Sequence, residues 1–183
     1  YRTDCLIKVY EDLAREMIKK VAIIGGGVIG GGWAARFLLN GLDVYVYDPD
    51  PNVEKTLSEI INNARFALPM LYESQLPKEG KIKFCKSIAE AVVGSDWIQE
   101  SVPERLKIKH LLYQDIQTSC PESAIIASST SVFKPSELQE NSKELKRKFS
   151  CKFLCESLVT EKFVACDVLQ HSCEENSHEM RLA

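Results

Sequence analysis

A short glycine-rich stretch, residues 21–30, constrains the fold of this 183-residue chain more than any other feature. It reads Val-Ala-Ile-Ile-Gly-Gly-Gly-Val-Ile-Gly, and its first four residues are an apolar run typical of a fully buried strand. Behind the glycines, apolar residues recur with helical spacing at Ile29, Trp33 and Phe37. The stretch therefore predicts a strand, a tight glycine turn and a helix.

The glycines at 25, 27 and 30 form the pattern G-x-G-x-x-G, which in this context is typical of dinucleotide binding. Gly25 allows the tight turn, Gly27 lets a pyrophosphate approach the backbone, and Gly30 lets helix and strand pack closely. The N–H groups and the positive end of the helix dipole then face the phosphates. The alternative is a glycine-rich turn that binds no ligand. The candidate cofactor-binding residues of this loop are Gly25, Gly26, Gly27, Val28, Ile29 and Gly30.

A second predicted strand, residues 43–47, ends in Asp48 at about the spacing expected of a ribose-binding acid. Its carboxylate would accept hydrogen bonds from both hydroxyls of the adenosine ribose and would repel a 2′-phosphate. The residues that follow, Pro49, Asp50 and Pro51, include no arginine to bind such a phosphate. The sequence therefore favours NAD over NADP.

Strand and helix patterns alternate along the remaining chain. This alternation predicts an α/β fold, a Rossmann-like doubly wound parallel sheet with right-handed crossovers. Pro103 is expected to open a helix whose apolar positions include Ile108 and Leu111. The expected elements are helices at about 52–68, 87–94 and from 103 onward, and strands at 81–85, 96–100 and 124–127.

Composition excludes several classes of partner. The net charge of −3 favours neither nucleic acid nor an anionic membrane surface, and no apolar run has the length of a membrane span. The seven cysteines show no repeated C-x-x-C, so we interpret them as reduced thiols of a cytoplasmic protein. A zinc site is the alternative, but its spacing matches no familiar pattern. We predict no metal; the residues considered were Cys151, Cys155, His171 and Cys173.

Three polar groups follow predicted strands and should meet at the carboxyl edge of the sheet. They are the acids Glu100 and Glu104, the lysines Lys107 and Lys109, and the hydroxyl cluster 128–131. Each has a structural alternative: Glu104 as a partner of the helix dipole, Lys109 as part of a solvated helix face, and the serines as ordinary turn residues.

The order of these motifs resembles the NAD-binding domain of the 3-hydroxyacyl-CoA dehydrogenase family. The resemblance covers about residues 17–140 and rests on the glycine loop, Asp48, the segment 100–109 and Ala-Ser-Ser-Thr-Ser at 127–131. Within the family, residues 21–37, 48–51, 96–100 and 133–139 look most like the branch that oxidises L-carnitine. The resemblance implies NAD-dependent oxidation of the 3-hydroxyl of a small 3-hydroxy acid. A 3-hydroxyacyl-CoA of fatty acid β-oxidation is the alternative substrate.

The resemblance also implies residue roles. Glu104 and Lys109 match positions near the nicotinamide side of the cofactor, and Ser131 matches a serine that contacts this side and the substrate oxygen. The family's catalytic base is a histidine in a His-Pro-Phe-Asn-Pro-like motif, and this sequence departs from that pattern after about Glu140.

The motifs divide the sequence into three expected parts. Residues 17–140 form the Rossmann domain, residues 1–16 a helical extension, and residues 141–183 a divergent tail in place of the family's C-terminal helical domain. We therefore expect a truncated form that binds NAD, and the family's homodimer is doubtful here. A non-catalytic NAD-binding or interaction module is the alternative function.

Overall fold

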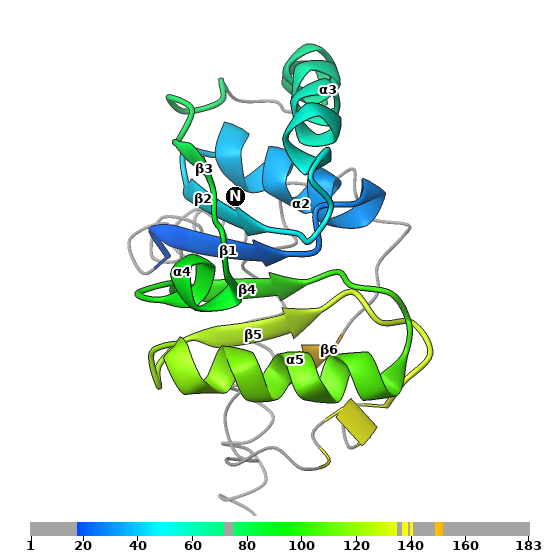
Figure 1. Cartoon of the computed structure of the whole chain (residues 1–183). Helices are drawn as coiled ribbons and strands as arrows, with labels where there is room; N and C mark the ends of the chain where they lie inside the picture. Colours follow the sequence, from blue (N-terminus) through cyan, green and yellow to red (C-terminus); the bar gives the residue numbers. More distant parts are fainter. Residues whose placement is uncertain (1–17, 72–74, 135–136, 139, 141–148, 152–183) are drawn as a thin grey trace, which may run out of the picture. The chain divides into compact units, whose positions relative to one another are not determined.

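The computed structural model describes residues 18–71, 75–134, 137–138, 140 and 149–151, all within one compact unit, Ile18–Phe153. Its centre is a parallel sheet with the strand order β3-β2-β1-β4-β5-β6 (Figure 1). The order changes direction between β1 and β4, which is the switch point of a doubly wound sheet. The Rossmann-like prediction is confirmed. The strands are β1 Lys20–Ile24, β2 Asp43–Tyr47, β3 Ile82–Phe84, β4 Trp97–Glu100, β5 Ile125–Ser128 and β6 Phe149–Cys151.

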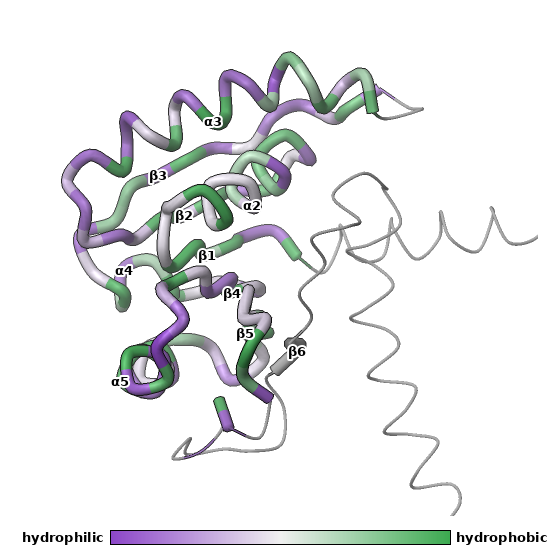
Figure 2. The backbone as a smooth tube through the Cα atoms, turned by 90° about the vertical axis from the view of Figure 1, so that its right-hand side faces the viewer, coloured by the Kyte–Doolittle hydropathy of each residue, from purple (hydrophilic) through white to green (hydrophobic). Residues whose placement is uncertain are grey.

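Helices cover both faces of the sheet (Figure 2). Ala22, Ile24 and Ile98 pack into one apolar core with side chains of α4 and α5. The alternate residues of each strand point to the opposite face, where α2 packs against β1, β2 and β4 and α3 packs against α2. The helices are α2 Val28–Leu39, α3 Val53–Ala67, α4 Ile88–Val92 and α5 Leu106–Ser119, with a 3₁₀ turn η1 at Leu68–Met70.

Local sequence explains most of these elements. In β2 the valines are buried while the flanking residues are half-buried, as expected for a strand with two unlike faces. Helix α3 buries only Leu57 and Ile61, and its tube alternates between hydrophilic and hydrophobic segments (Figure 2). Ser87 caps α4 by accepting a hydrogen bond from the Glu90 N–H at 3.2 Å, as its sequence predicts.

The sequence-based account of α5 was wrong about where the helix begins. The helix begins at Leu106, so Pro103 lies in the preceding turn, where its carbonyl accepts a hydrogen bond from the Arg105 N–H at 2.7 Å. Two of its apolar positions, Ile108 and Leu111, are 39% and 65% exposed. The inner face of the helix, which packs against the sheet, includes a charged residue. The buried residues are Lys109, Leu112, Tyr113 and Ile116.

Strand β6 was not foreseen from the sequence. It pairs in parallel with β5, with Phe149 opposite Ile126 and Cys151 opposite Ser128. Part of the segment 141–183 therefore extends the sheet. Residues 1–16, most of 141–183 and the cysteine and histidine side chains considered for zinc lie outside the described residues, so those predictions stay predictions. Within the described part of the chain, no helix combines the length and apolarity that crossing a membrane requires.

Candidate functional site

Hydrogen bonds tie the ends of four neighbouring strands together. The Gly25 N–H donates to the last carbonyl of β2, Tyr47 O, at 2.9 Å. In the same way, the Ser101 N–H donates to Ile24 O of β1 and the Ser129 N–H donates to Glu100 O of β4, both at 2.8 Å. We call these three bonds the edge ladder. It brings four parts of the chain to one edge of the sheet, as the sequence predicts: the glycine loop, Asp48, the turn that carries Glu104, and the hydroxyl cluster 128–131, which we call the serine turn.

Two glycines of the loop are required by close packing. Gly25 has a φ of +95°, and a Cβ there would lie 2.7 Å from Ser101 O. A Cβ on Gly30 would lie 1.8 Å from Gly25 O. Gly27 is different, because it is exposed and a Cβ there would meet nothing within 4 Å. The open side of the loop therefore lies at Gly27.

The open side of the loop suits a pyrophosphate. Helix α2 starts there, and its first intrahelical hydrogen bond runs from the Gly31 N–H to Gly27 O at 2.7 Å. The N–H groups ahead of Gly31 precede this bond and have no intrahelical acceptor. Such groups, together with the helix dipole, attract a phosphate. Val28 and Ile29 lie on the same exposed turn.

Asp48 is bound to the glycine loop. Its Oδ2 accepts a hydrogen bond from the Gly26 N–H at 2.6 Å, and its Oδ1 accepts one from the Asp50 N–H at 2.8 Å. A carboxylate offers about four acceptor positions, so two remain for the hydroxyls of a ribose. The glycine loop and the acid therefore form one unit whose donors and acceptors fit the adenosine half of NAD.

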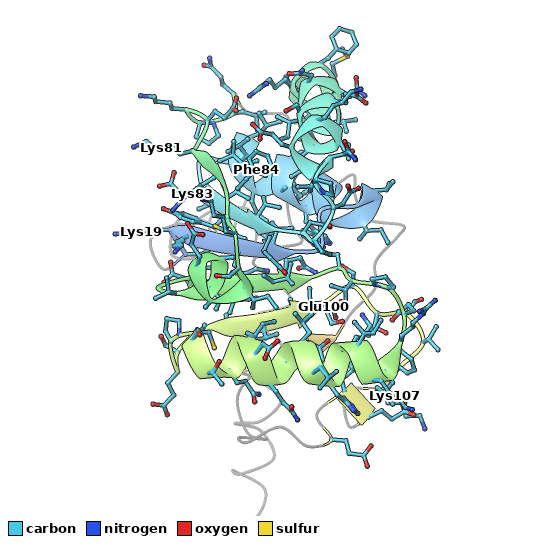
Figure 3. The ribbon with its side chains drawn as sticks, in the orientation of Figure 1. Lys19, Lys81, Lys83, Phe84, Glu100 and Lys107 are labelled. Atoms are coloured by element: carbon cyan, nitrogen blue, oxygen red, sulfur yellow. The ribbon has the colours of Figure 1, made fainter. Side chains whose placement is uncertain are left out.

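Glu100 is the last residue of β4 (Figure 3), and the second half of the site is built around it. Its side chain is fully buried, and its Oε1 accepts hydrogen bonds from the Val102 N–H at 2.8 Å and from Lys109 Nζ at 2.7 Å. Its Oε2 accepts from Lys109 Nζ at 2.9 Å, the Tyr113 hydroxyl at 2.6 Å and the Ser128 hydroxyl at 2.5 Å. Glu100 therefore accepts from all of these partners and is ion-paired with Lys109. We call Glu100, Lys109, Tyr113 and Ser128 the Glu100 cluster.

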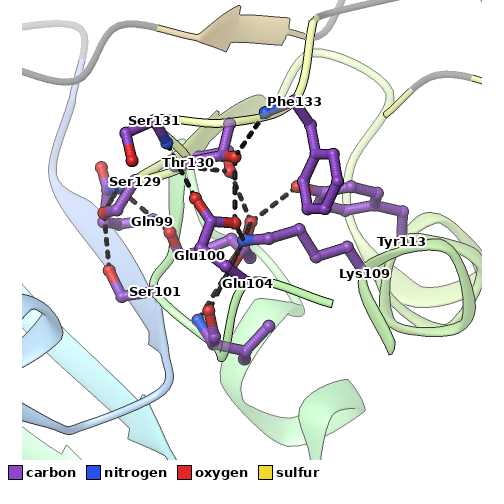
Figure 4. Close-up of polar contacts among 12 residues, drawn as sticks. Gln99, Glu100, Ser101, Glu104, Lys109, Tyr113, Ser129, Thr130, Ser131 and Phe133 are labelled. Atoms are coloured by element: carbon purple, nitrogen blue, oxygen red, sulfur yellow. Dashed lines mark hydrogen bonds and ion pairs between the residues drawn. The ribbon is translucent and has the colours of Figure 1, made fainter. Parts of the chain in front are cut away.

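Glu104 lies beside this cluster (Figure 4), and its side chain is partly exposed. Its Oε1 accepts a hydrogen bond from the Ser131 N–H at 2.8 Å. Its Oε2 accepts one from the Thr130 hydroxyl at 3.0 Å and lies 3.3 Å from Lys109 Nζ. Partial burial raises the pKa of Glu104, but the hydrogen bonds and the lysine charge outweigh it and leave the pKa below its usual value. Both oxygens of the Glu104 carboxylate are therefore fixed by hydrogen bonds, while one side of the group remains accessible to solvent.

The structural alternative for Lys109 was wrong, because its side chain is only 1% exposed and is ion-paired with Glu100. Its position nevertheless follows a signal present in the sequence: residues 109, 112, 113 and 116 are spaced as one helix face. Tyr113 was missed because Lys109 was not recognised as part of that face. Thr130 was expected only as a member of the hydroxyl cluster 128–131. Gln99 was also missed; its Nε2 donates to the Ser129 hydroxyl at 2.9 Å.

Ser131 is the remaining candidate, and His110 is a histidine on α5 that was not predicted to be the base. Ser131 is exposed and follows Thr130 directly at the serine turn, where its N–H holds Glu104. His110 is the one histidine among the described residues. Its Nε2 donates to Glu137 O at 2.7 Å, so this nitrogen is not available as a proton acceptor.

Comparison with known proteins identifies the family to which this sequence is similar. A family model described as the NAD-binding domain of 3-hydroxyacyl-CoA dehydrogenase matches residues 20–159. An L-carnitine dehydrogenase/betainyl-CoA thioesterase from Ruegeria pomeroyi is 62% identical over 119 residues, which are 65% of this chain and 24% of that protein. An L-carnitine dehydrogenase from Mesorhizobium japonicum is 53% identical over 67% of this chain and 34% of its own length. The chain thus spans about a quarter to a third of these relatives.

Solved structures share the fold. The structure of an NAD⁺-dependent dismutase, 5-formyl-3-hydroxy-2-methylpyridine 4-carboxylic acid 5-dehydrogenase, has a TM-score of 0.65 and 34% identity. The match covers 72% of this chain and 43% of that one. A (S)-3-hydroxybutyryl-CoA dehydrogenase from Ralstonia eutropha has a TM-score of 0.60 at 21% identity, over 72% of this chain and 47% of its own, and shows the fold alone.

Proposed function

Because the chain belongs to the 3-hydroxyacyl-CoA dehydrogenase family and its cofactor is NAD, we propose that it provides the cofactor site for oxidation of the 3-hydroxyl of L-carnitine. The carnitine assignment is supported by relatives of 53–62% identity that are named L-carnitine dehydrogenase. The structural observation that carries the proposal is the 2.6 Å bond from the Gly26 N–H to Asp48, because it joins the phosphate loop to the ribose-binding acid.

We assign the adenosine half of NAD to the glycine loop and Asp48. The residues of the loop are Gly25, Gly26, Gly27, Val28, Ile29 and Gly30. The backbone around Gly27 binds the pyrophosphate, and Asp48 accepts hydrogen bonds from the ribose. A carboxylate in this position repels a 2′-phosphate, which supports NAD as the preferred dinucleotide.

We assign the other half of the cofactor to the edge formed by Glu104, Lys109 and Ser131. In a doubly wound sheet a dinucleotide crosses the switch point, from β1 and β2 to β4 and β5. Glu104 and Ser131 follow β4 and β5 and are held together by the bond from the Ser131 N–H. Lys109 is buried, so it contributes by anchoring Glu104. Bound NAD supplies the acceptor, nicotinamide C4, for the hydride leaving C3 of the substrate.

Ser131 is the candidate contact for the substrate oxygen, but its neutral hydroxyl is not a base near pH 7. Oxidation of an alcohol needs a group that accepts the hydroxyl proton, and such a base contributes roughly 10²–10⁴-fold to the rate. His110 is engaged with Glu137 O, and the histidines 171 and 178 lie outside the described residues. We therefore propose that the 183-residue polypeptide oxidises L-carnitine thousands of times more slowly than its full-length relatives.

The lack of an identified base in the described part favours a second candidate function, NAD binding without catalysis. One pair of measurements separates the two functions: a titration with NAD, and NADH formation with L-carnitine, each on the 183-residue chain and a full-length relative. Slow turnover that disappears in Ser131→Ala supports the dehydrogenase. NAD binding with no turnover at any carnitine concentration supports the binding module. Failure to bind NAD would reject both.

A further inference from the structure

The charges at the edge that we assign to the nicotinamide half of NAD are not balanced. Glu100 and Glu104 are two carboxylates, and among the described residues Lys109 is the one cation in contact with both. Lys107 and Arg105 lie on the same turn of chain but are exposed to solvent. The three-residue group of Glu100, Lys109 and Glu104 therefore carries a formal charge of −1.

The lysine charge is shared unequally between the two acids. Lys109 Nζ lies 2.7 and 2.9 Å from the two oxygens of Glu100 but 3.3 Å from the nearer oxygen of Glu104. Glu100 and Lys109 are both buried, so their attraction is weakly screened. Lys109 is thus chiefly the counter-ion of Glu100, and the unbalanced negative charge lies on Glu104.

Glu104 also bears this charge where a ligand could meet it. Its side chain is 35% exposed, whereas those of Lys109 and Glu100 are 1% and 0% exposed. The Ser131 N–H and the Thr130 hydroxyl fix both of its oxygens at the carboxyl edge of β4 and β5. A cationic group lying across this edge would be attracted, and an uncharged group of the same shape would not.

The nicotinamide ring changes charge in this way: it is cationic in NAD⁺ and neutral in NADH. We propose that Glu100 is a positioning residue that retains Lys109 as its own counter-ion and so leaves Glu104 to favour the oxidised cofactor. This inference rests on the proposed function, because it requires the nicotinamide half of NAD to lie over β4 and β5. Loss of the Glu100 charge releases Lys109 to neutralise Glu104.

The test compares the dissociation constants of NAD⁺ and NADH, measured by calorimetry and by NADH fluorescence on the whole 183-residue chain. The quantity compared is the ratio of the two constants, Kd of NADH divided by Kd of NAD⁺, in each variant and in the unmodified protein. Glu104→Gln removes the charge directly and should reduce this ratio about tenfold. Glu100→Gln should reduce it by a similar factor, although Glu100 touches no cofactor. A purely structural role for Glu100 would weaken both forms equally and leave the ratio unchanged.

Three further variants sharpen the comparison. Ser128→Ala removes one hydrogen bond from Glu100 without removing charge, so the ratio should not change. Asp48→Ala acts at the adenosine end and should weaken both forms equally. If Glu100→Gln does not fold, Glu100→Asp keeps the buried charge but shortens its reach to Lys109. It should lower the ratio in the same direction.

The outcomes separate the two proposals. Suppose that NAD⁺ binds, that Asp48→Ala weakens this binding, and that the ratio of the NAD⁺ and NADH dissociation constants is the same in Glu100→Gln and in the unmodified protein. The role of Glu100 is then refuted, while the cofactor site stands. An unchanged ratio in Glu100→Asp has the same meaning where that variant replaces Glu100→Gln. If neither NAD⁺ nor NADH binds the unmodified chain, both proposals are rejected.

Discussion

The two halves of the site use different parts of the chain: one uses mainly backbone groups and the other uses side chains. The half at β1 and β2 is made of backbone: glycines 25, 27 and 30 and the first turn of α2, with Asp48 as its acid. The half at β4 and β5 is made of side chains, the buried Glu100 cluster with Glu104 at its margin. The first half depends on glycines, which have no side chain. The second half depends on hydrogen-bond and ion-pair partners for buried charged groups.

This difference determines how each half should fail. In the glycine half, an added side chain blocks space that the backbone or a phosphate needs. In the Glu100 half, a removed side chain leaves a buried charge or hydroxyl without its partner. The substitutions below test this contrast and are arranged from the largest expected effect to the smallest.

Gly30→Ala should have the largest effect, because its Cβ would lie 1.8 Å from Gly25 O, a backbone atom that cannot turn aside. We expect a loss of about 3 kcal/mol or more in the free energy of unfolding, at the upper end for overpacking. Urea denaturation followed by circular dichroism measures it. A fully stable variant would show that α2 shifts easily, contrary to the tight contact of loop and helix.

Gly27→Val should abolish NAD binding while preserving the fold. A Cβ at Gly27 meets no protein atom within 4 Å, so the new side chain would occupy only the space assigned to the pyrophosphate. The far-ultraviolet circular dichroism spectrum should stay native, and titration with NAD should show no binding. Gly32→Val is a matched control, because a Cβ at Gly32 also meets no atom within 4 Å. Unchanged NAD affinity in Gly27→Val would place the pyrophosphate elsewhere.

Asp48→Ala should weaken NAD binding ten- to a hundredfold, since hydrogen bonds to a charged group contribute roughly 1.5–3 kcal/mol. It should also reduce the preference for NAD over NADP, because the charge that repels a 2′-phosphate is gone. Titrations of both dinucleotides with the variant and with the unmodified protein measure these effects. Equal affinities for NAD and NADP in the unmodified protein would contradict the role of Asp48.

Tyr113→Phe should leave cofactor affinity unchanged and lower stability modestly. It removes a 2.6 Å hydrogen bond to Glu100 but leaves the donors Lys109, Ser128 and the Val102 N–H in place. We expect a loss of about 1–3 kcal/mol in the free energy of unfolding. Thermal unfolding with and without NAD measures both quantities. A tenfold change in NAD affinity would mean that the cluster and the cofactor site are more closely coupled than their contacts indicate.

The sequence predicts the glycine half far better than the Glu100 half. A glycine turn between an apolar strand and a helix has a local signature, and Asp48 lies at a characteristic spacing from it. The contact between Lys109 and Glu100 depends instead on how far α5 rotates about its axis. The apolar residues Ile108 and Leu111 do not indicate this rotation, because both are exposed in the structure.

Other features depend on contacts distant in sequence. Ser128 meets Glu100 across a separation of 28 residues, and no local pattern encodes that pairing. Strand β6 is short and follows a basic segment, so only its pairing with β5 identifies it. The roles of Glu104, Lys109 and Ser131 came from family resemblance and remain proposals, now supported by the geometry that joins them.

The edge ladder has a consequence for how the loops of this site can vary in length. Its three bonds fix the first residue after β1, β4 and β5 to the neighbouring strand, at Gly25, Ser101 and Ser129. An insertion directly after a strand would remove one of these bonds, whereas an insertion a few residues later would leave all three in place. Loop grafting and substrate reprogramming should therefore begin beyond these residues, for example after Ser131, where new sequence can be added without disturbing the register of the sheet.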